Sequence, residues 1–173
     1  RLRVLPCLAI LALVLPASGC RSPFFYPTRE HSPVPGLENV VRQDVRFASE
    51  DGVPLHGWLL SPRDRVSRGT ILFLHGNAEN ISSHYRFLAW MTEHGYHVLT
   101  FDYRGYGHSD GVPSPQGMGE DAVAVIHWVQ RANDDAPADV PMVLFGQSLG
   151  GAILLQAMGK VTDRRRIAAV VID

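Results

Sequence analysis

Apolar residues follow two patterns along the chain, and the two patterns alternate. Short, largely apolar runs are typical of strands covered on both faces; they occupy residues 70–74, 96–101, 143–145 and 167–172. Elsewhere apolar residues recur every three or four positions, as on one face of a helix; these stretches are 81–91, 114–129 and 152–158. The alternation predicts an α/β fold with a doubly wound, mostly parallel sheet and right-handed crossovers.

The region before these runs is patterned differently. Apolar and polar residues alternate over residues 40–48, which predicts a strand. A second strand is predicted at residues 55–60, after the turn signal Asp51-Gly52. The two segments predict an antiparallel hairpin at one edge of the sheet. We therefore assign residues 40–173 to one folded domain.

The N-terminal 20 residues have the features of a secretory signal. Arg1 and Arg3 precede an apolar run over residues 4–15, and small residues then lead to Cys20. This end resembles the lipobox of bacterial lipoproteins, in which the cysteine carries the lipid. We expect residues 1–20 to be a signal peptide with lipidation at Cys20. An ordinary cleaved signal and an uncleaved anchor are the alternatives.

Prolines are frequent in the next stretch, residues 21–39. They predict a flexible tether without regular structure between the anchor and the domain. Acyl chains on Cys20 would hold the protein on a membrane. The expected location is therefore the bacterial cell envelope, facing the periplasm or the exterior.

Composition and charge exclude several classes of protein. The 173 residues are 46% hydrophobic and 19% charged, with a formal net charge of −1. These values argue against disorder and against a nucleic-acid partner. The basic run 164–166 is interpreted as a solvated loop. Cys7 and Cys20 have no cysteine partner in the domain, and no cysteine–histidine spacing indicates a metal site. We expect no cofactor.

The sequence Gly146-Gln147-Ser148-Leu149-Gly150 lies between a predicted strand and a predicted helix. This G-x-S-x-G pattern in that setting predicts a nucleophile elbow, a strained turn that exposes the serine hydroxyl. The two glycines let the strand and the helix approach closely. The alternative is a glycine-rich turn with an incidental serine.

Loops after the strands of an open α/β sheet meet at one edge. The loop His75-Gly76-Asn77 is therefore expected beside Gln147 and Ser148. A serine that attacks an acyl group needs two amides for the developing oxyanion. The predicted donors are the N–H groups of Leu149 and Asn77. Gly76 lets the loop turn close to the serine, and His75 is expected to shape the loop through a hydrogen bond within it.

A second glycine-rich loop follows at residues 102–111. Asp102 and Arg104 are interpreted as braces of this loop. Tyr103, Tyr106 and His108 are candidates for lining an acyl or leaving-group pocket.

The motifs H-G-N-A-E-N, F-D-Y-R-G-Y-G-H-S-D-G and F-G-Q-S-L-G-G, in this order, resemble the α/β-hydrolase superfamily. Within it they resemble the bacterial branch of serine aminopeptidase-like and prolyl-oligopeptidase-like hydrolases, over residues 40–173. The resemblance implies a serine hydrolase fold present through its sixth strand, with Ser148 as nucleophile and Leu149 and Asn77 as oxyanion donors.

A serine hydroxyl also needs a base to take its proton. In this fold the acid and the histidine follow the serine in the chain, yet all eight histidines precede Ser148. We expect the sequence to be a fragment whose acid and histidine lie further on. A complete but inactive relative is the alternative. Asp173 is a weaker candidate for the acid.

Two functions remain open at this point. The first is an envelope-anchored hydrolase that cleaves an ester, thioester or amide of a small-molecule or peptide acyl substrate through an acyl-enzyme on Ser148. The second is a non-catalytic protein of the same fold that binds or scaffolds. In either case the 173-residue chain alone is expected to be inactive.

Overall fold

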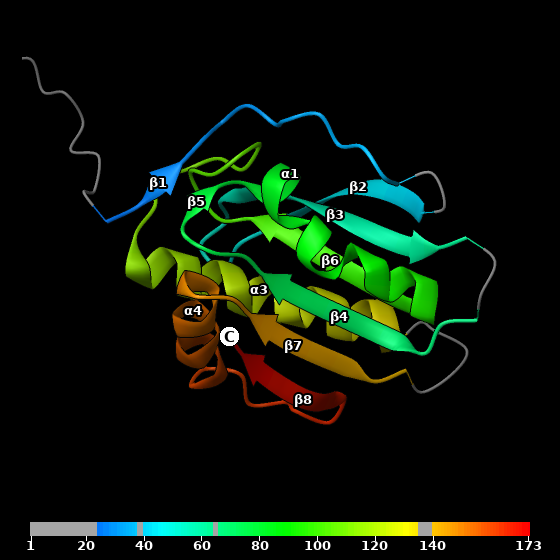
Figure 1. Ribbon diagram of the computed structural model, residues 1–173. Coiled ribbons are helices and arrows are strands. Elements are labelled where there is room, and N and C mark those ends of the chain that lie inside the picture. The colour runs from blue at the N-terminus through cyan, green and yellow to red at the C-terminus, as the bar shows by residue number, and fades with distance from the viewer. Residues whose placement is uncertain (1–23, 38–39, 64–65, 135–139) are drawn as a thin grey trace, which may run out of the picture.

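The computed structural model describes residues 24–37, 40–63, 66–134 and 140–173. Their centre is a six-stranded mixed sheet (Figure 1) in the order β2-β3-β6-β4-β7-β8. The strands are β2 (Val40–Ala48), β3 (Pro54–Pro62), β4 (Gly69–Leu74), β6 (Tyr96–Asp102), β7 (Met142–Gly146) and β8 (Ile167–Ile172). The predicted α/β class with a doubly wound, mostly parallel sheet is confirmed.

The N-terminal hairpin lies where the alternating pattern predicts it. β2 pairs antiparallel with β3 from Val40–Pro62 to Ala48–Pro54, and β2 forms the sheet edge. β3 is also antiparallel to β6, whereas β6, β4, β7 and β8 run parallel to one another. The hairpin is therefore the antiparallel part of an otherwise parallel sheet.

Helices cover both faces of the sheet. On one face, α3 (Pro115–Asp134) and α4 (Leu149–Met158) enclose a core that includes Leu72 and Leu74 of β4. On the other, α1 (Ile81–His84), α2 (Arg86–Ala89) and the 3₁₀ helix η1 (Trp90–His94) pack on Ile71 and Phe73. Successive side chains of β4 thus enter opposite cores, which explains why all six of its residues are buried.

One predicted helix is divided. The apolar spacing over residues 81–91 predicts a single helix, but the structure has α1, α2 and η1 in succession. The apolar face is retained, because Ile81, Tyr85 and Leu88 are buried. Gly95 ends the series as expected, with a left-handed φ of 85° that suits glycine.

The prediction of a buried strand at residues 167–172 is wrong in one respect. β8 forms, but it lies at the edge of the sheet and five of its six residues are exposed. Hydrophobicity alone indicated burial, but in the described residues most of this strand is exposed. Val170, Val171 and Ile172 are the exposed apolar residues.

The described part of the predicted tether carries more structure than expected. Tyr26–Pro27 forms β1, which pairs in parallel with β5 (Ala78–Glu79) just after the loop that follows β4. The prediction of no regular structure is wrong at these residues. We call residues 24–37 the N-terminal segment; Figure 1 shows it running from β1 past α1, along one side of the domain, toward β2. The predicted signal and Cys20 lie outside the described residues.

The order of the strands creates a switch point at β4. The chain passes from β4 to β6 on one side and then, through α3, to β7 on the other side of β4. In open α/β sheets, ligands bind at such a point, outside the carboxyl ends of the strands. The loops that leave β4 and β7 meet there, and they contain the predicted site residues. Within the described residues, no helix has the length and hydrophobicity needed to cross a membrane.

Candidate active site

Ser148 occupies the sharp turn between β7 and α4. Its backbone has φ 51° and ψ −114°, an unusual conformation for a residue with a side chain, and the residue is exposed. The Gln147 N–H donates to the Leu74 carbonyl oxygen at 3.0 Å, and the Ser148 N–H donates to the Asp173 carbonyl oxygen at 2.7 Å. The turn is thus fixed by the ends of both neighbouring strands, β4 and β8.

The glycines on either side of Ser148 are required because a side chain at either position would collide with the backbone. A Cβ on Gly150 would lie 2.0 Å from the Leu74 carbonyl oxygen, and one on Gly146 would lie 2.7 Å from the Gly150 carbonyl oxygen. Neither atom can move without displacing a strand or the first turn of α4. The glycines therefore hold the helix close to the sheet at the serine, as the G-x-S-x-G pattern predicts.

The loop after β4 lies beside the serine. A Cβ built on Gly76 would be 4.0 Å from the Ser148 Cβ and 3.9 Å from Gln147 Oε1. Gln147 Oε1 is itself buried and has no hydrogen-bond partner among the described residues. The structure therefore brings together the two loops that the sequence predicted would converge.

The two predicted oxyanion donors lie on these loops. Leu149 is the first residue of α4, where the backbone N–H groups have no acceptor inside the helix. The side chain of Asn77 is occupied elsewhere: Nδ2 donates to the Phe24 carbonyl oxygen at 2.7 Å, and Oδ1 accepts from the Tyr106 hydroxyl at 3.1 Å. These contacts fix the residue, so that its backbone N–H is the group suited to a donor role.

His75 is completely buried within the same loop. Its Nδ1 lies 2.8 Å from the Gly76 carbonyl oxygen, which is the hydrogen bond within the loop that the sequence predicted. Burial, followed by the nearby His84, lowers the pKa of His75 to about 4, so the ring is neutral at pH 7. Its Nε2 has no partner in the described residues. The geometry matches a loop-shaping histidine.

Two tyrosines support this loop, a function that the sequence did not reveal. The Tyr103 hydroxyl donates to the His75 carbonyl oxygen, and the Tyr106 hydroxyl donates to the Asn77 carbonyl oxygen, both at 2.8 Å. Both tyrosines are fully buried. The prediction that they line an acyl pocket is therefore wrong, because neither side chain has a surface open to a substrate.

Asp102 and Arg104 brace the second loop, as predicted. Asp102 Oδ1 accepts from the Ile81 N–H at 3.0 Å, and Oδ2 accepts from the His108 N–H at 3.1 Å. Burial opposes ionisation of Asp102, but hydrogen bonds from His31 and His56 hold its pKa well below the usual range. Arg104 is bonded to Asp121 and Asp51.

Asp173 reaches the elbow through its backbone. Besides accepting from the Ser148 N–H, it donates its own N–H to the Gly146 carbonyl oxygen at 3.0 Å. Its side chain is exposed, and its assignment as the acid stays a prediction. All eight histidines lie in the described residues, and none is hydrogen-bonded to the Ser148 hydroxyl.

Comparisons with known proteins bear on the family and the fold of the chain. Residues 65–172 match the protein family described as serine aminopeptidase, S33. The Escherichia coli (strain K12) protein YfhR is 38% identical over 154 residues, which are 87% of this chain and 52% of YfhR. The lysophosphatidylserine lipase ABHD12 of Macaca fascicularis is 37% identical over 100 residues, 57% of this chain and 24% of that protein.

Among solved structures, the Pyrococcus furiosus esterase Pf2001 superposes with a TM-score of 0.65 at 25% identity. The match covers 86% of this chain and 57% of the esterase. The chain thus spans about half the length of the relatives it matches.

Proposed function

Because this chain belongs to the serine aminopeptidase S33 family of α/β-hydrolases, we propose that it is the nucleophile-bearing part of a serine hydrolase. The observation that carries the proposal is the strained, exposed Ser148 between β7 and α4, beside the loop that contains Asn77. A strained backbone at an exposed polar residue is a common property of catalytic turns.

The proposed reaction forms and then hydrolyses an acyl-enzyme. The Ser148 oxygen attacks the acyl carbon of an ester, thioester or amide, and its proton passes to a general base. The base then protonates the departing alcohol, thiol or amine, and water releases the acid and restores the serine. The N–H groups of Leu149 and Asn77 stabilise the tetrahedral oxyanion, where losing one donor typically costs about 100-fold in rate or more.

The base in this proposal is a histidine supported by an Asp, both from the whole protein beyond residue 173. This placement agrees with the order serine, acid, histidine in this fold and with the absence of a histidine bonded to Ser148 in the described residues. The 173-residue chain alone is then expected to show only background turnover.

We favour a carboxylic ester as substrate and the bacterial cell envelope as location. The names of two matched proteins, an esterase and a lysophosphatidylserine lipase, support ester cleavage. The predicted lipidation of Cys20 supports the location. A non-catalytic protein of this fold is the second candidate, because no histidine in the described residues is hydrogen-bonded to the Ser148 hydroxyl.

A fluorophosphonate probe, which reacts with activated serines, tests the proposal on the whole gene product. We expect labelling of the unchanged protein and none of Ser148→Ala. The matched control is Ser83→Ala, which removes another exposed serine and should label normally. Labelling that survives in Ser148→Ala, or a reading frame that stops after codon 173, would favour the non-catalytic alternative.

A further inference from the structure

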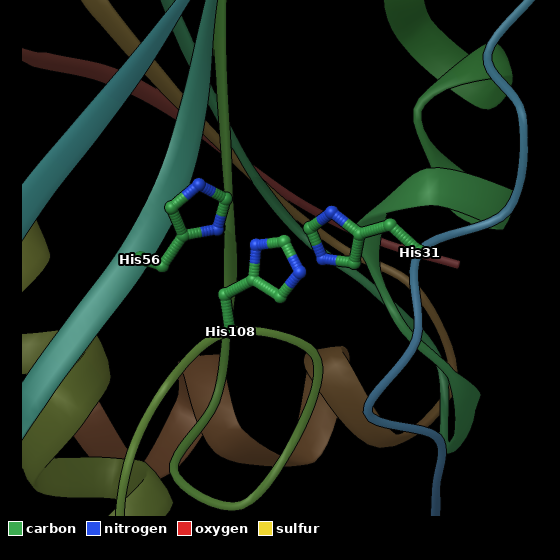
Figure 2. A group of neighbouring side chains, drawn as sticks. All are labelled: His31, His56 and His108. Atoms are coloured by element: carbon green, nitrogen blue, oxygen red, sulfur yellow. The ribbon is translucent and has the colours of Figure 1, made fainter.

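Three histidines from distant parts of the sequence meet at one point (Figure 2). His31 belongs to the N-terminal segment, His56 to β3 and His108 to the loop after β6. One ring nitrogen from each lies within 4.8 Å of the others. They are 25 and 52 positions apart in the chain, so no local spacing in the sequence could have indicated the cluster.

The carboxylate of Asp102 adjoins two of these three rings. Its Oδ2 lies 2.9 Å from His31 Nε2 and 3.3 Å from His56 Nδ1. Neighbouring ligands of a tetrahedral zinc ion, with bonds of about 2.1 Å, are about 3.4 Å apart. The His56–Asp102 distance is close to this value, whereas the 2.9 Å hydrogen bond between His31 and Asp102 would have to lengthen by about 0.5 Å on binding.

The second nitrogen of His56 is held by another carboxylate. His56 Nε2 lies 2.8 Å from Asp44 Oδ1, which also accepts from Trp58 Nε1 at 3.1 Å. Metal-binding histidines almost always donate their other ring N–H to such a group, which fixes the ring and the tautomer. In the metal-free chain Nδ1 of His56 donates to Asp102; on binding zinc it would release that proton and present its lone pair to the ion.

We propose that His31, His56, His108 and Asp102 form a binding site for a zinc ion. Imidazole nitrogens with one carboxylate oxygen are donors suited to zinc, whereas calcium and magnesium require mostly oxygen. Binding needs a local adjustment, because His31 and His108 stack with centroids 3.8 Å apart and cannot both face one ion in that orientation. His108 is exposed and has room to turn.

The charge of the site also favours a cation. Asp102 is fully buried, and its ion-pair partners among the described residues are His31 and His56, with no lysine or arginine. Buried carboxylates in proteins are paired or bind metal. A zinc ion would neutralise Asp102 while leaving both histidines uncharged.

The ion would connect the N-terminal segment to the sheet. His31 is the ligand from that segment, whereas His56, Asp102 and His108 come from β3, the end of β6 and the following loop. None of the four is part of the proposed serine chemistry. The role we assign to zinc is therefore structural, and its binding is measurable without a substrate.

Zinc binding tests the proposal directly, using the full chain without a polyhistidine tag after treatment with a chelator. Titration calorimetry should show one zinc per chain, and Co²⁺ should give the strong visible absorption of four-coordinate cobalt. His108→Ala and His31→Ala should each weaken binding at least about tenfold. Asp44→Asn, which removes no ligand, should weaken it about tenfold.

His94→Ala is the matched control, because His94 is exposed and lies on η1 away from the ligands. It should bind zinc as tightly as the unchanged chain. Circular dichroism of the metal-free variants shows whether each is folded; His108→Ala alters an exposed side chain and is the decisive one. Absence of stoichiometric binding, or equal affinity in His108→Ala and His94→Ala, would overturn the proposal.

Discussion

At the scale of single residues, the burial of His75 makes the free energy of unfolding depend on pH. The folded chain holds this ring neutral down to about pH 4, whereas an unfolded histidine takes up a proton near pH 6.5. Between these values the unfolded state binds more protons, so the free energy of unfolding falls as the pH is lowered. The protonation of His75 in the unfolded state lowers the free energy of unfolding by about 3 kcal/mol in total, and this decrease is complete below about pH 4.

The variant His75→Asn should remove this loss. Its amide N–H can replace the Nδ1 donor to the Gly76 carbonyl oxygen, but asparagine does not titrate. From pH 7 to pH 4.5, the unchanged chain should lose about 2 kcal/mol more stability in urea unfolding than the variant does. Other titrating groups are common to both proteins and cancel in the difference. Equal losses would mean that His75 is protonated in the folded state.

Single residues also show what sequence can and cannot reveal. The turn at Ser148 and the hydrogen bond of His75 depend on neighbours in the chain, and both features were predicted. Tyr103 and Tyr106 were misassigned, because their acceptors lie 28 and 29 positions away. The sequence does not indicate which distant carbonyl oxygen a tyrosine hydroxyl will bond.

At the scale of elements, the loop after β6 is fixed to α3 by a buried ion pair. The Arg104 N–H donates to Asp121 Oδ2 at 2.9 Å, and its guanidinium donates to Asp121 Oδ1 at 2.7 and 3.0 Å. Asp121 is fully buried on α3. The pair orders the loop that also carries Tyr103 and Tyr106.

Asp121→Asn should therefore destabilise the chain by about 3 kcal/mol, because it removes the buried anionic partner of Arg104 and leaves only the more exposed carboxylates of Asp51 and Glu120. Asp163→Asn is the control: its pair with Arg165 is exposed, and the change in stability should be too small to resolve in the same measurement. Urea unfolding measures both. If the two variants lose the same stability, Asp51 alone suffices to hold Arg104.

The elements whose boundaries depend on local sequence patterns were predicted closely. The hairpin, the central strands and the start of α3 after Ser114 were predicted, since each depends on local periodicity or capping. β1 was missed because its partner β5 lies 52 positions further on, and two residues carry no periodicity.

At the scale of the whole molecule, β8 leaves an apolar strand edge open. Such an edge presents unpaired backbone groups and tends to pair with another chain. We expect the 173-residue chain to self-associate as its concentration rises.

Val171→Lys should reduce this association, because a charged side chain on an edge strand opposes pairing. Val66→Lys is the matched control, since Val66 is exposed outside the sheet and should leave the association unchanged. Light scattering during gel filtration measures the mass of each. A monomeric unchanged chain at all concentrations would contradict the prediction.

The order of the strands in the sheet could not be predicted from the sequence. The meeting of the loops that follow the strands could be predicted. Parallel strands joined by helices place their following loops at one edge whatever the order. For this reason the convergence of Gly76 and Ser148 was predictable, whereas the edge position of β8 and the meeting of His31 with Asp102 were not.

The pairing of β1 with β5 indicates that the folded domain includes the N-terminal segment and does not begin at β2. Shortening the protein to residues 40–173 would follow the sheet but would remove the acceptor of Asn77 Nδ2 and the acceptors of Asn80 Nδ2 at Thr28 and Glu30. It would also expose one side of Asp102. A trimmed domain would keep the hydrogen bonds from Tyr103 and Tyr106 to the loop facing the serine but would lose those that tie this loop and α1 to the N-terminal segment.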